Sequence, residues 1–175
     1  MFNYCPSCAS ANIRFEDARV FKCPDCGFVY YHNTAAATAL LVDTGRGIIF
    51  VRRGKEPAAG KLDFPGGFVE PREGAVDGLI RECREEIGWA PERGALSLFA
   101  SFPNVYPYKN IVYNTCDLFF SIRTGWPAEI IAEKLRPMQK EIAGIVLAGY
   151  EDIDLDEIAF DSVRAAVSLY LKKLN

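Results

Sequence analysis

The sequence predicts an α/β fold, an α/β/α sandwich around a mixed sheet, preceded by a small separate unit. Strand-like apolar segments alternate with two segments of helical periodicity, one near residues 73–88 and one from about Asp161 onward. Ahead of them, residues 1–33 carry four of the six cysteines. A length of 175 residues suits one ordinary domain with a small appendage. We therefore predict two units, residues 1–33 and residues 34–175.

The N-terminal unit contains two Cys-x2-Cys pairs separated by fourteen residues, namely Cys5 and Cys8, then Cys23 and Cys26. This spacing predicts a zinc ribbon in which four thiolates hold one structural Zn²⁺. Two disulfides are the alternative, which i,i+3 pairs in a cytosolic chain disfavour. A closed four-cysteine site has no open position, so this zinc is not expected to be catalytic.

The ribbon is too small to fold by burial alone. About 33 residues bury too little apolar surface, so metal binding is expected to supply the free energy of folding. A short hairpin is expected in Ile13–Val20, between the two pairs of cysteines.

Charge in residues 1–33 argues against a nucleic-acid partner. Three basic and three acidic side chains give a net charge of zero: Arg14, Arg19 and Lys22 against Glu16, Asp17 and Asp25. Binding to a phosphate backbone needs a basic patch. The ribbon is therefore expected to be a scaffold or a dimer contact.

The remaining composition predicts a cytoplasmic protein without a membrane partner. Apolar residues make up 50% and charged residues 25% of the chain, and the net charge is −3. The longest apolar run, Ala35–Val42, stops at Asp43 and falls well short of the ~20 residues of a membrane span. The N-terminus lacks the basic and apolar regions of a signal peptide.

Beyond residue 33 the apolar pattern predicts five main strands. They are expected at Ala35–Val42, Ile48–Arg52, Leu96–Phe102, Ile111–Ile122 and Glu141–Leu147. Leu62–Glu70 is also strand-like but is broken by Pro-Gly-Gly, where glycines let the backbone turn sharply and approach a ligand. Arg53–Gly60 is expected to be a polar loop, and Arg123–Lys140, with two prolines, an irregular connection.

The segment before Gly88 has the periodicity of a core-facing helix. Its apolar residues recur 3, 4, 7 and 11 residues after the first: Val76, Leu79, Ile80, Cys83 and Ile87. Pro71 lies just before the start and Gly88 just past the end, the usual asymmetry of a helix. A second stripe predicts the C-terminal helix, through Val163, Val167, Tyr170 and Leu174. The apolar surroundings of Cys83 and Cys116 predict core thiols rather than nucleophiles.

The far side of the first helix is acidic, with Glu82, Glu85 and Glu86 at i, i+3 and i+4. Like charges at this spacing destabilise a helix by about 0.2–0.5 kcal/mol per pair. The helix macrodipole also disfavours acids in the last turn. A solvated acidic face is the ordinary interpretation, but the Gly66-Gly67 turn at a fixed distance upstream favours a site for a divalent cation.

The stretch from Gly67 to Trp89 resembles the Nudix box. That box runs glycine, five residues, glutamate, seven residues, Arg-Glu, an apolar residue, any residue, Glu-Glu, any residue, glycine and an apolar residue. Its fixed positions here are Gly67, Glu73, Arg81, Glu82, Glu85, Glu86 and Gly88, with Cys83 and Trp89 in the apolar slots. The resemblance implies a Nudix sandwich for residues 34–175, which hydrolyses a nucleoside diphosphate linked to another group with Mg²⁺ or Mn²⁺.

The resemblance also assigns roles to residues. The implied catalytic residues are Glu73, Arg81, Glu82, Glu85 and Glu86. The implied metal ligands are Glu82, Glu85, Glu86, the backbone carbonyl of Gly67 or of its neighbour Gly66, and Glu141. Arg81 is expected to pair with Glu73 or Glu85, and one helix glutamate to orient or deprotonate the attacking water.

A zinc ribbon ahead of a Nudix domain resembles the NADH pyrophosphatase branch of the family. That branch carries a downstream motif, Ser-Gln-Pro-Trp-Pro-Phe-Pro-x-Ser. The stretch 101–108 matches it at Ser101, Pro103 and Pro107 and has Tyr106 in place of Phe. Substrate contacts are therefore expected from Ser101, Tyr106 and Tyr108. The rings of Phe102, Tyr106 and Tyr108 are expected to form a wall on which a base stacks, with packing in the core as the alternative.

Arginine is expected to meet the phosphates. Arg52 and Arg53 are consecutive on a strand, so their side chains should point to opposite faces and only one should reach the site. Arg52 is taken as the substrate-binding one. Phe160 and Asp161, at the start of the last helix, are expected to close the site.

The substrate is expected to be a small nucleotide of the NADH, FAD or ADP-ribose type, cleaved to a nucleoside monophosphate. House-cleaning hydrolysis of a damaged nucleoside triphosphate is one alternative. A regulator that binds ADP-ribose or nucleic acid without catalysis is another, although the intact acidic box argues against it. Nudix relatives are frequently homodimers, so a dimer is expected by analogy.

Overall fold

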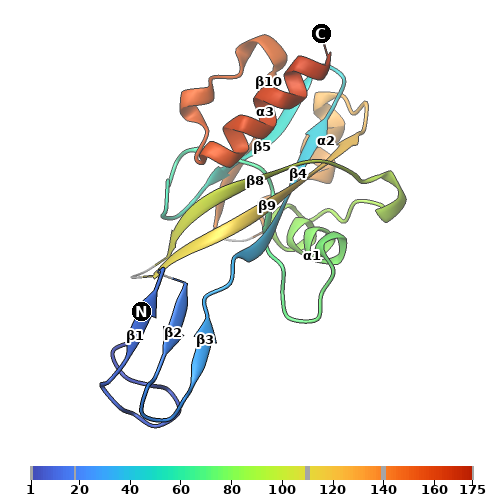
Figure 1. Ribbon diagram of the computed structural model, residues 1–175. Helices are drawn as coiled ribbons and strands as arrows, with labels where there is room; N and C mark the ends of the chain where they lie inside the picture. Colours follow the sequence, from blue (N-terminus) through green and yellow to red (C-terminus); the bar gives the residue numbers. More distant parts are fainter. Residues whose placement is uncertain (1, 18, 109–110, 139–140, 175) are drawn as a thin grey trace.

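A computed structural model describes residues 2–17, 19–108, 111–138 and 141–174 of the protein. Figure 1 shows two parts: a small sheet near the N-terminus, at one end of the molecule, and a larger sheet with helices packed on it. The predicted boundary at residues 33 and 34 falls between the last strand of the small sheet and the first strand of the large one.

The small sheet is a three-stranded antiparallel ribbon. Its strands, in the order β1-β2-β3, are β1 (Arg14–Glu16), β2 (Val20–Lys22) and β3 (Val29–Tyr31). Phe21 is its central buried side chain, and the rings of Phe2, Phe15 and Phe28 surround it at centroid distances of 5.2, 5.3 and 6.0 Å. Strands β1 and β2 form the predicted hairpin, which runs two residues further than expected, to Lys22. Residue 18 lies outside the described residues.

The large sheet is mixed. In the described chain it has seven strands, five of them in the order β10-β5-β4-β9-β8, while β6 pairs with β5 and β7 with β4. They are β4 (Ala35–Asp43), β5 (Gly47–Arg53), β6 (Leu62–Asp63), β7 (Gly66–Phe68), β8 (Ser97–Tyr108), β9 (Ile111–Arg123) and β10 (Ile142–Gly149). The pairing of β4 with β9 is parallel and the others are antiparallel.

Helices cover both faces of this sheet. The described helices are α1 (Ala75–Ile87), α2 (Ala128–Lys134) and α3 (Asp161–Leu174), with short 3-10 turns η1 (Arg93–Ala95), η2 (Tyr150–Asp152) and η3 (Leu155–Glu157). On β4, Leu40 and Val42 pack in one core with α1 and α2, whereas Leu41 packs in a second core with α3. Because successive strand residues point to opposite faces, the two cores lie on opposite sides of the sheet. The predicted α/β/α sandwich is confirmed.

Two predictions about the elements are corrected. Helix α2 interrupts the connection Arg123–Lys140, of which residues 139–140 lie outside the described residues. This helix has seven residues, too few for stability alone, and is held by burial of Ile131 in the core. Strand β8 continues past Phe102 to Tyr108 despite two prolines, since at a sheet edge their missing N–H groups break no ladder hydrogen bond.

The two remaining cysteines differ from each other. Cys83 is fully buried in the core under α1, as predicted. Cys116 is exposed, so its prediction as a core thiol is wrong. Its neighbours Thr115 and Asp117 on β9 are buried on the α3 side, which turns Cys116 to the other face.

A buried carboxylate ties α3 to the sheet. Asp43, at the end of β4, is fully buried and accepts hydrogen bonds from the hydroxyls of Tyr150 at 2.5 Å and Tyr170 at 2.9 Å. The Gly45 N–H donates to it as well, at 2.7 Å. These contacts hold the C-terminal half of α3 against β4. None of the helices described is long and apolar enough to cross a membrane.

Candidate active site

Helix α1 carries the acidic cluster and is fixed at its C-terminal end. Gly88 adopts a left-handed conformation with φ 70°, which closes the helix and suits glycine. The last carbonyls of α1 accept from the backbone: Met138 N–H donates to Glu86 at 2.9 Å and Arg136 N–H to Ile87 at 3.0 Å. The segment after α2 therefore holds the last turn of α1 in place.

Arg81 lies at the centre of the cluster. Its guanidinium makes a bidentate contact with Glu73, with both distances 3.0 Å, and reaches Glu82 at 2.8 Å and Glu85 at 3.4 Å. It also donates to the carbonyl of Phe68 at 3.1 Å. The contact with Arg81 lowers the pKa of Glu73. Arg81 thus contacts both Glu73 and Glu85, which the sequence offered as alternative partners.

Glu86 and Glu82 face Gly66 and Gly67 at the start of β7 rather than open solvent. The Gly66 N–H donates to Glu86 at 2.9 Å. Burial raises the pKa of Glu86 to about 8, and the nearby carboxylates of Glu82, Asp63 and Glu141 act in the same direction. Burial also raises the pKa of Glu82, against the effect of Arg81. Burial thus disfavours the charged form of both carboxylates.

The first two residues of β7, Gly66 and Gly67, lie so close to their neighbours that side chains are excluded. A Cβ atom at Gly67 would lie 2.6 Å from the carboxyl carbon of Glu82. At Gly66, with φ 150°, a Cβ atom would collide with the carbonyl of Thr38. The Gly66 and Gly67 backbone therefore meets the acidic face directly, which the fixed spacing from Gly67 to the helix acids predicted.

A cavity of about 310 Å³ opens beside the cluster. Its lining contains six acidic side chains and one basic side chain: Asp63, Glu70, Glu82, Glu86, Asp117 and Glu141, with Arg53. Aromatic rings complete the walls, among them Phe68, Tyr106 and Phe160. An anionic ligand is repelled by such a lining unless cations accompany it.

Arg53 and Asp63 form one wall of this cavity. The Arg53 guanidinium donates to Asp63 at 2.8 Å and to the Pro57 carbonyl at 2.7 Å. It lies 4.9 Å from the centroid of the Phe160 ring and 6.0 Å from that of Tyr106. Burial raises the pKa of Asp63 to about 6, although Arg53 opposes the rise.

The predicted substrate-binding residues do not all line the same cavity. Tyr106 lines the cavity, and Glu141 lines it too while forming an ion pair with Lys55. The structure puts Arg53 in the cavity wall, whereas Arg52 points away and donates to the Gly60 carbonyl at 2.6 Å. Tyr108 is half-exposed and lines neither this cavity nor the next one.

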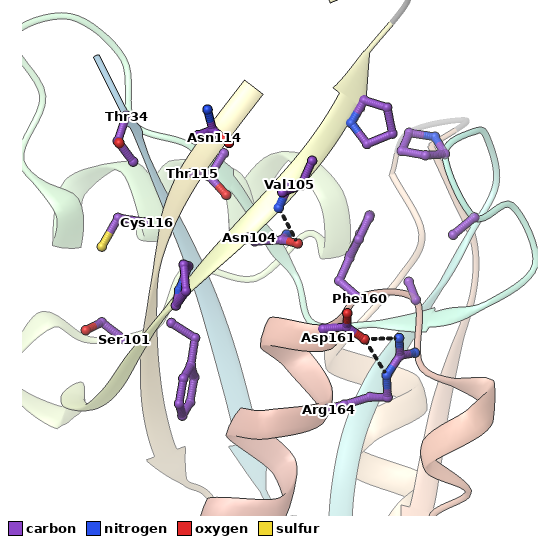
Figure 2. Close-up of a pocket in the computed structure, with 16 residues that line it drawn as sticks. Thr34, Ser101, Asn104, Val105, Asn114, Thr115, Cys116, Phe160, Asp161 and Arg164 are labelled. Carbon is purple, nitrogen blue, oxygen red and sulfur yellow. Dashed lines mark hydrogen bonds and ion pairs between the residues drawn. The ribbon is translucent and has the colours of Figure 1, made fainter. Parts of the chain in front are cut away.

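Ser101 lines a second, more open cavity of about 770 Å³ (Figure 2). Its lining comes from both sides of edge strand β8, with Ser101 and Cys116 on one side and Asp161 and Arg164 on the other. It shares Asn104, Thr115 and Phe160 with the first cavity. Phe160, expected to close the site, thus borders both.

Several lining residues were not found from the sequence. Asp63 precedes the glycine turn in a strand-like stretch, and only its charge at a buried strand position marks it. Asp117 lies on β9, where its carboxylate accepts from the Thr115 hydroxyl at 2.6 Å and the Ser162 hydroxyl at 2.7 Å. Asp117 is the lone acid of β9, and this was the signal available.

The N-terminal cysteines form a separate site. Cys5 and Cys26 have sulfurs 3.6 Å apart, as do Cys8 and Cys23, and all four ligand atoms lie within 4.8 Å of one another. Four sulfurs at about 2.3 Å from a tetrahedral zinc would be separated by about 3.8 Å, so the arrangement suits that metal. Among the described residues, no other group of three or more His, Cys, Asp or Glu side chains has its ligand atoms as close together.

Comparison with protein families decides what the large domain is. The sequence-family model of the NUDIX domain matches residues 32–165 of this chain. The chain belongs to the Nudix family. The cluster around Arg81 is therefore the Nudix box of this chain, and the predicted resemblance is confirmed.

Relatives within the Nudix family carry two kinds of name. The chain is 30% identical to the NAD-capped RNA hydrolase NudC of Chromobacterium violaceum over 86% of its own length and 50% of the relative's. It is 29% identical to the ADP-ribose pyrophosphatase of Methanocaldococcus jannaschii over 47% of its length and 48% of that protein. The chain thus spans about half the length of these curated relatives.

A solved Nudix structure has the same fold over nearly the whole chain. The crystal structure of a NUDIX hydrolase from Nitrosomonas europaea superposes with a TM-score of 0.66 at 20% identity, covering 97% of this chain and 90% of that one. The likeness extends across both the ribbon and the sandwich.

Proposed function

We propose that this Nudix protein is a divalent-metal-dependent hydrolase that cleaves the pyrophosphate of a nucleoside diphosphate linked to another group and releases a nucleoside monophosphate. The observation that carries the proposal is the position of Glu82 and Glu86 on the wall of a cavity that also holds Arg53 and aromatic rings. Carboxylates provide sites for cations, and the rings and the arginine suit a nucleotide.

The residues fit Mg²⁺ or Mn²⁺. These ions prefer oxygen ligands, and the cavity presents carboxylates of which Glu86 has a pKa raised by burial to about 8. Glu82, Glu85, Glu86 and Glu141, with the carbonyl of Gly67, would hold the ions. When bound, such ions neutralise the charge that develops on the phosphate oxygens during hydrolysis.

The side chains of the protein itself have three tasks in this scheme. Arg81, braced by Glu73, keeps Glu82 and Glu85 in place. One of the three helix glutamates accepts a proton as water attacks phosphorus, and the bridging P–O bond breaks to release the two monophosphate products. Arg53 and Tyr106 bind the nucleotide. Arg52 and Tyr108 lie outside the cavity, so the proposal transfers the phosphate-binding part from Arg52 to Arg53.

The names of the relatives support a substrate with an ADP moiety, such as NADH, FAD or ADP-ribose. The neutral ribbon, in which Lys22 pairs with Glu16 at 2.7 Å, supports a small molecule rather than a nucleic acid as the main substrate. We propose one structural zinc in the ribbon and a homodimer in which the ribbon forms the contact.

A substrate panel tests the proposal. The purified protein is incubated with Mg²⁺ and NADH, NAD, FAD, ADP-ribose, NAD-capped RNA or nucleoside triphosphates, and the products are identified. AMP with a second monophosphate is the expected result. Pyrophosphate from a triphosphate would favour the house-cleaning alternative. Saturable binding without turnover of any compound would contradict the proposal and favour a regulator.

A further inference from the structure

We propose that Asp63 is a positioning residue that fixes the Arg53 guanidinium in the cavity wall and controls nucleotide affinity through it. The inference rests on the proposed function only in taking this cavity as the nucleotide site. It assigns a task to a buried acid that lies outside the Nudix box.

Contacts from several segments hold the Arg53 guanidinium. Nε donates to the Pro57 carbonyl at 2.7 Å, Nη1 to Asp63 at 2.8 Å and Nη2 to the Tyr106 hydroxyl at 3.4 Å, while Phe160 lies against its face. Among these described partners, Asp63 is the one with a full opposite charge. Hydrogen bonds between charged groups are roughly twice as strong as neutral ones, so Asp63 is the strongest of these restraints.

Asp63 is itself held in one orientation. It pairs with Val51 across β5 and β6, two residues before Arg53, so the Asp63 and Arg53 side chains share a face of the sheet. One carboxylate oxygen accepts the Phe64 N–H at 2.8 Å, which leaves the other for Arg53. The side chains of Arg53 and Asp63 are only 16% and 13% exposed, so solvent screens this ion pair little.

The effect is expected on binding more than on chemistry. Arg53 lies among aromatic rings, and its described hydrogen bonds and ion pairs include none to the box glutamates. A group of this kind binds the ground state and the transition state equally. Its loss raises KM and leaves kcat nearly unchanged.

Arg52 provides a matched control. It is the same residue type, one position earlier on the same strand, and its side chain lies outside the cavity against the Gly60 carbonyl. Replacing it removes the same charge from the protein without touching the cavity wall.

The test measures AMP affinity by calorimetry, which needs no turnover, together with KM and kcat for ADP-ribose. Asp63→Asn keeps the shape of the side chain and removes its charge. Asp63→Asn and Arg53→Ala are each expected to weaken AMP binding about tenfold or more, with kcat within about threefold. Arg52→Ala is expected to stay within about twofold of the wild type.

The double variant Arg53→Ala/Asp63→Asn decides whether Asp63 acts through Arg53. It is expected to bind AMP no more weakly than Arg53→Ala alone, because residues that act as one unit are not additive. It also removes both charges of the pair, so its comparison with Arg53→Ala remains decisive if Asp63→Asn alone does not fold.

Three outcomes overturn the inference: wild-type AMP affinity in Asp63→Asn, additive losses in the double variant, or no AMP binding by the wild-type protein. Weakened AMP binding in Asp63→Asn, with no hydrolysis of any compound by the wild type, would instead support the inference while the proposed function failed.

Discussion

Replacing Glu86 by glutamine is expected to separate stability from activity. Glutamine keeps the oxygen that accepts the Gly66 N–H and removes the charge. Burial raises the pKa of Glu86 from 4.5 to about 8 in the folded protein. Between pH 4.5 and about 8 the folded state therefore binds more protons than the unfolded state. The stability of the metal-free protein falls as the pH rises through this range.

The size of the effect follows from the same shift. At 1.36 kcal/mol per pKa unit, a rise from 4.5 to about 8 corresponds to at most about 5 kcal/mol at pH 9. Water in the open cavity screens part of this, so we expect Glu86→Gln to be about 1–3 kcal/mol more stable than the wild type at pH 9 and about equal at pH 4.5. Turnover is expected to fall at least about a hundredfold, because a proposed ligand of the catalytic metal loses its charge.

The assay is urea unfolding in EDTA at pH 4.5, 7 and 9, with turnover of ADP-ribose in Mg²⁺ measured alongside. Glu85→Gln is the control: it lies one residue away on α1, its side chain is 45% exposed and it retains Glu86, so its stability should match that of the wild type at each pH while its activity falls. Equal or lower stability of Glu86→Gln at pH 9 would refute the electrostatic reasoning. Near-normal turnover in either variant would refute the assignment of the site.

Other predictions address the turn, the sheet and the ribbon. Gly67→Ala places a Cβ atom 2.6 Å from the Glu82 carboxyl carbon, so turnover should fall at least about tenfold with the fold retained; unchanged kinetics would contradict the close approach. Tyr170→Phe should cost about 1–2 kcal/mol in urea unfolding, because buried Asp43 loses a partner, and no loss would show that water replaces the hydroxyl. Zinc measured by mass spectrometry should be near one per chain, and chelation should unfold the ribbon while the circular dichroism of the sandwich persists; metal-free protein with an intact ribbon would argue against the zinc site.

Local patterns in the sequence were sufficient to predict the cysteine cluster and the acidic helix. The structure brings the four cysteines together, and it places Gly66 against Glu86, as the short spacing from Gly67 to the helix acids predicted. The stripe of α1 likewise predicted the helix, because its burial depends on a period of 3.6 residues. The roles of these residues in catalysis remain predictions.

Features that depend on neighbouring strands were harder to predict. A strand was expected to end at Phe102, but β8 lies at the sheet edge and continues to Tyr108. Cys116 looked like a core residue until its place on β9 turned it outward. Helix α2 is too short for a pattern and owes its existence to the burial of Ile131.

The sequence by itself was sufficient to identify the family and to predict the reaction class and two sets of metal ligands, since these depend on residue types at fixed short spacings. Only the tertiary structure decided which residues line the cavity beside the Nudix box. Consecutive arginines on a strand point to opposite faces, and the sheet order alone selects Arg53 over Arg52. Asp63, Tyr106 and Phe160 come from distant parts of the chain and meet around that arginine through strand pairing and the packing of α3, which no local pattern records.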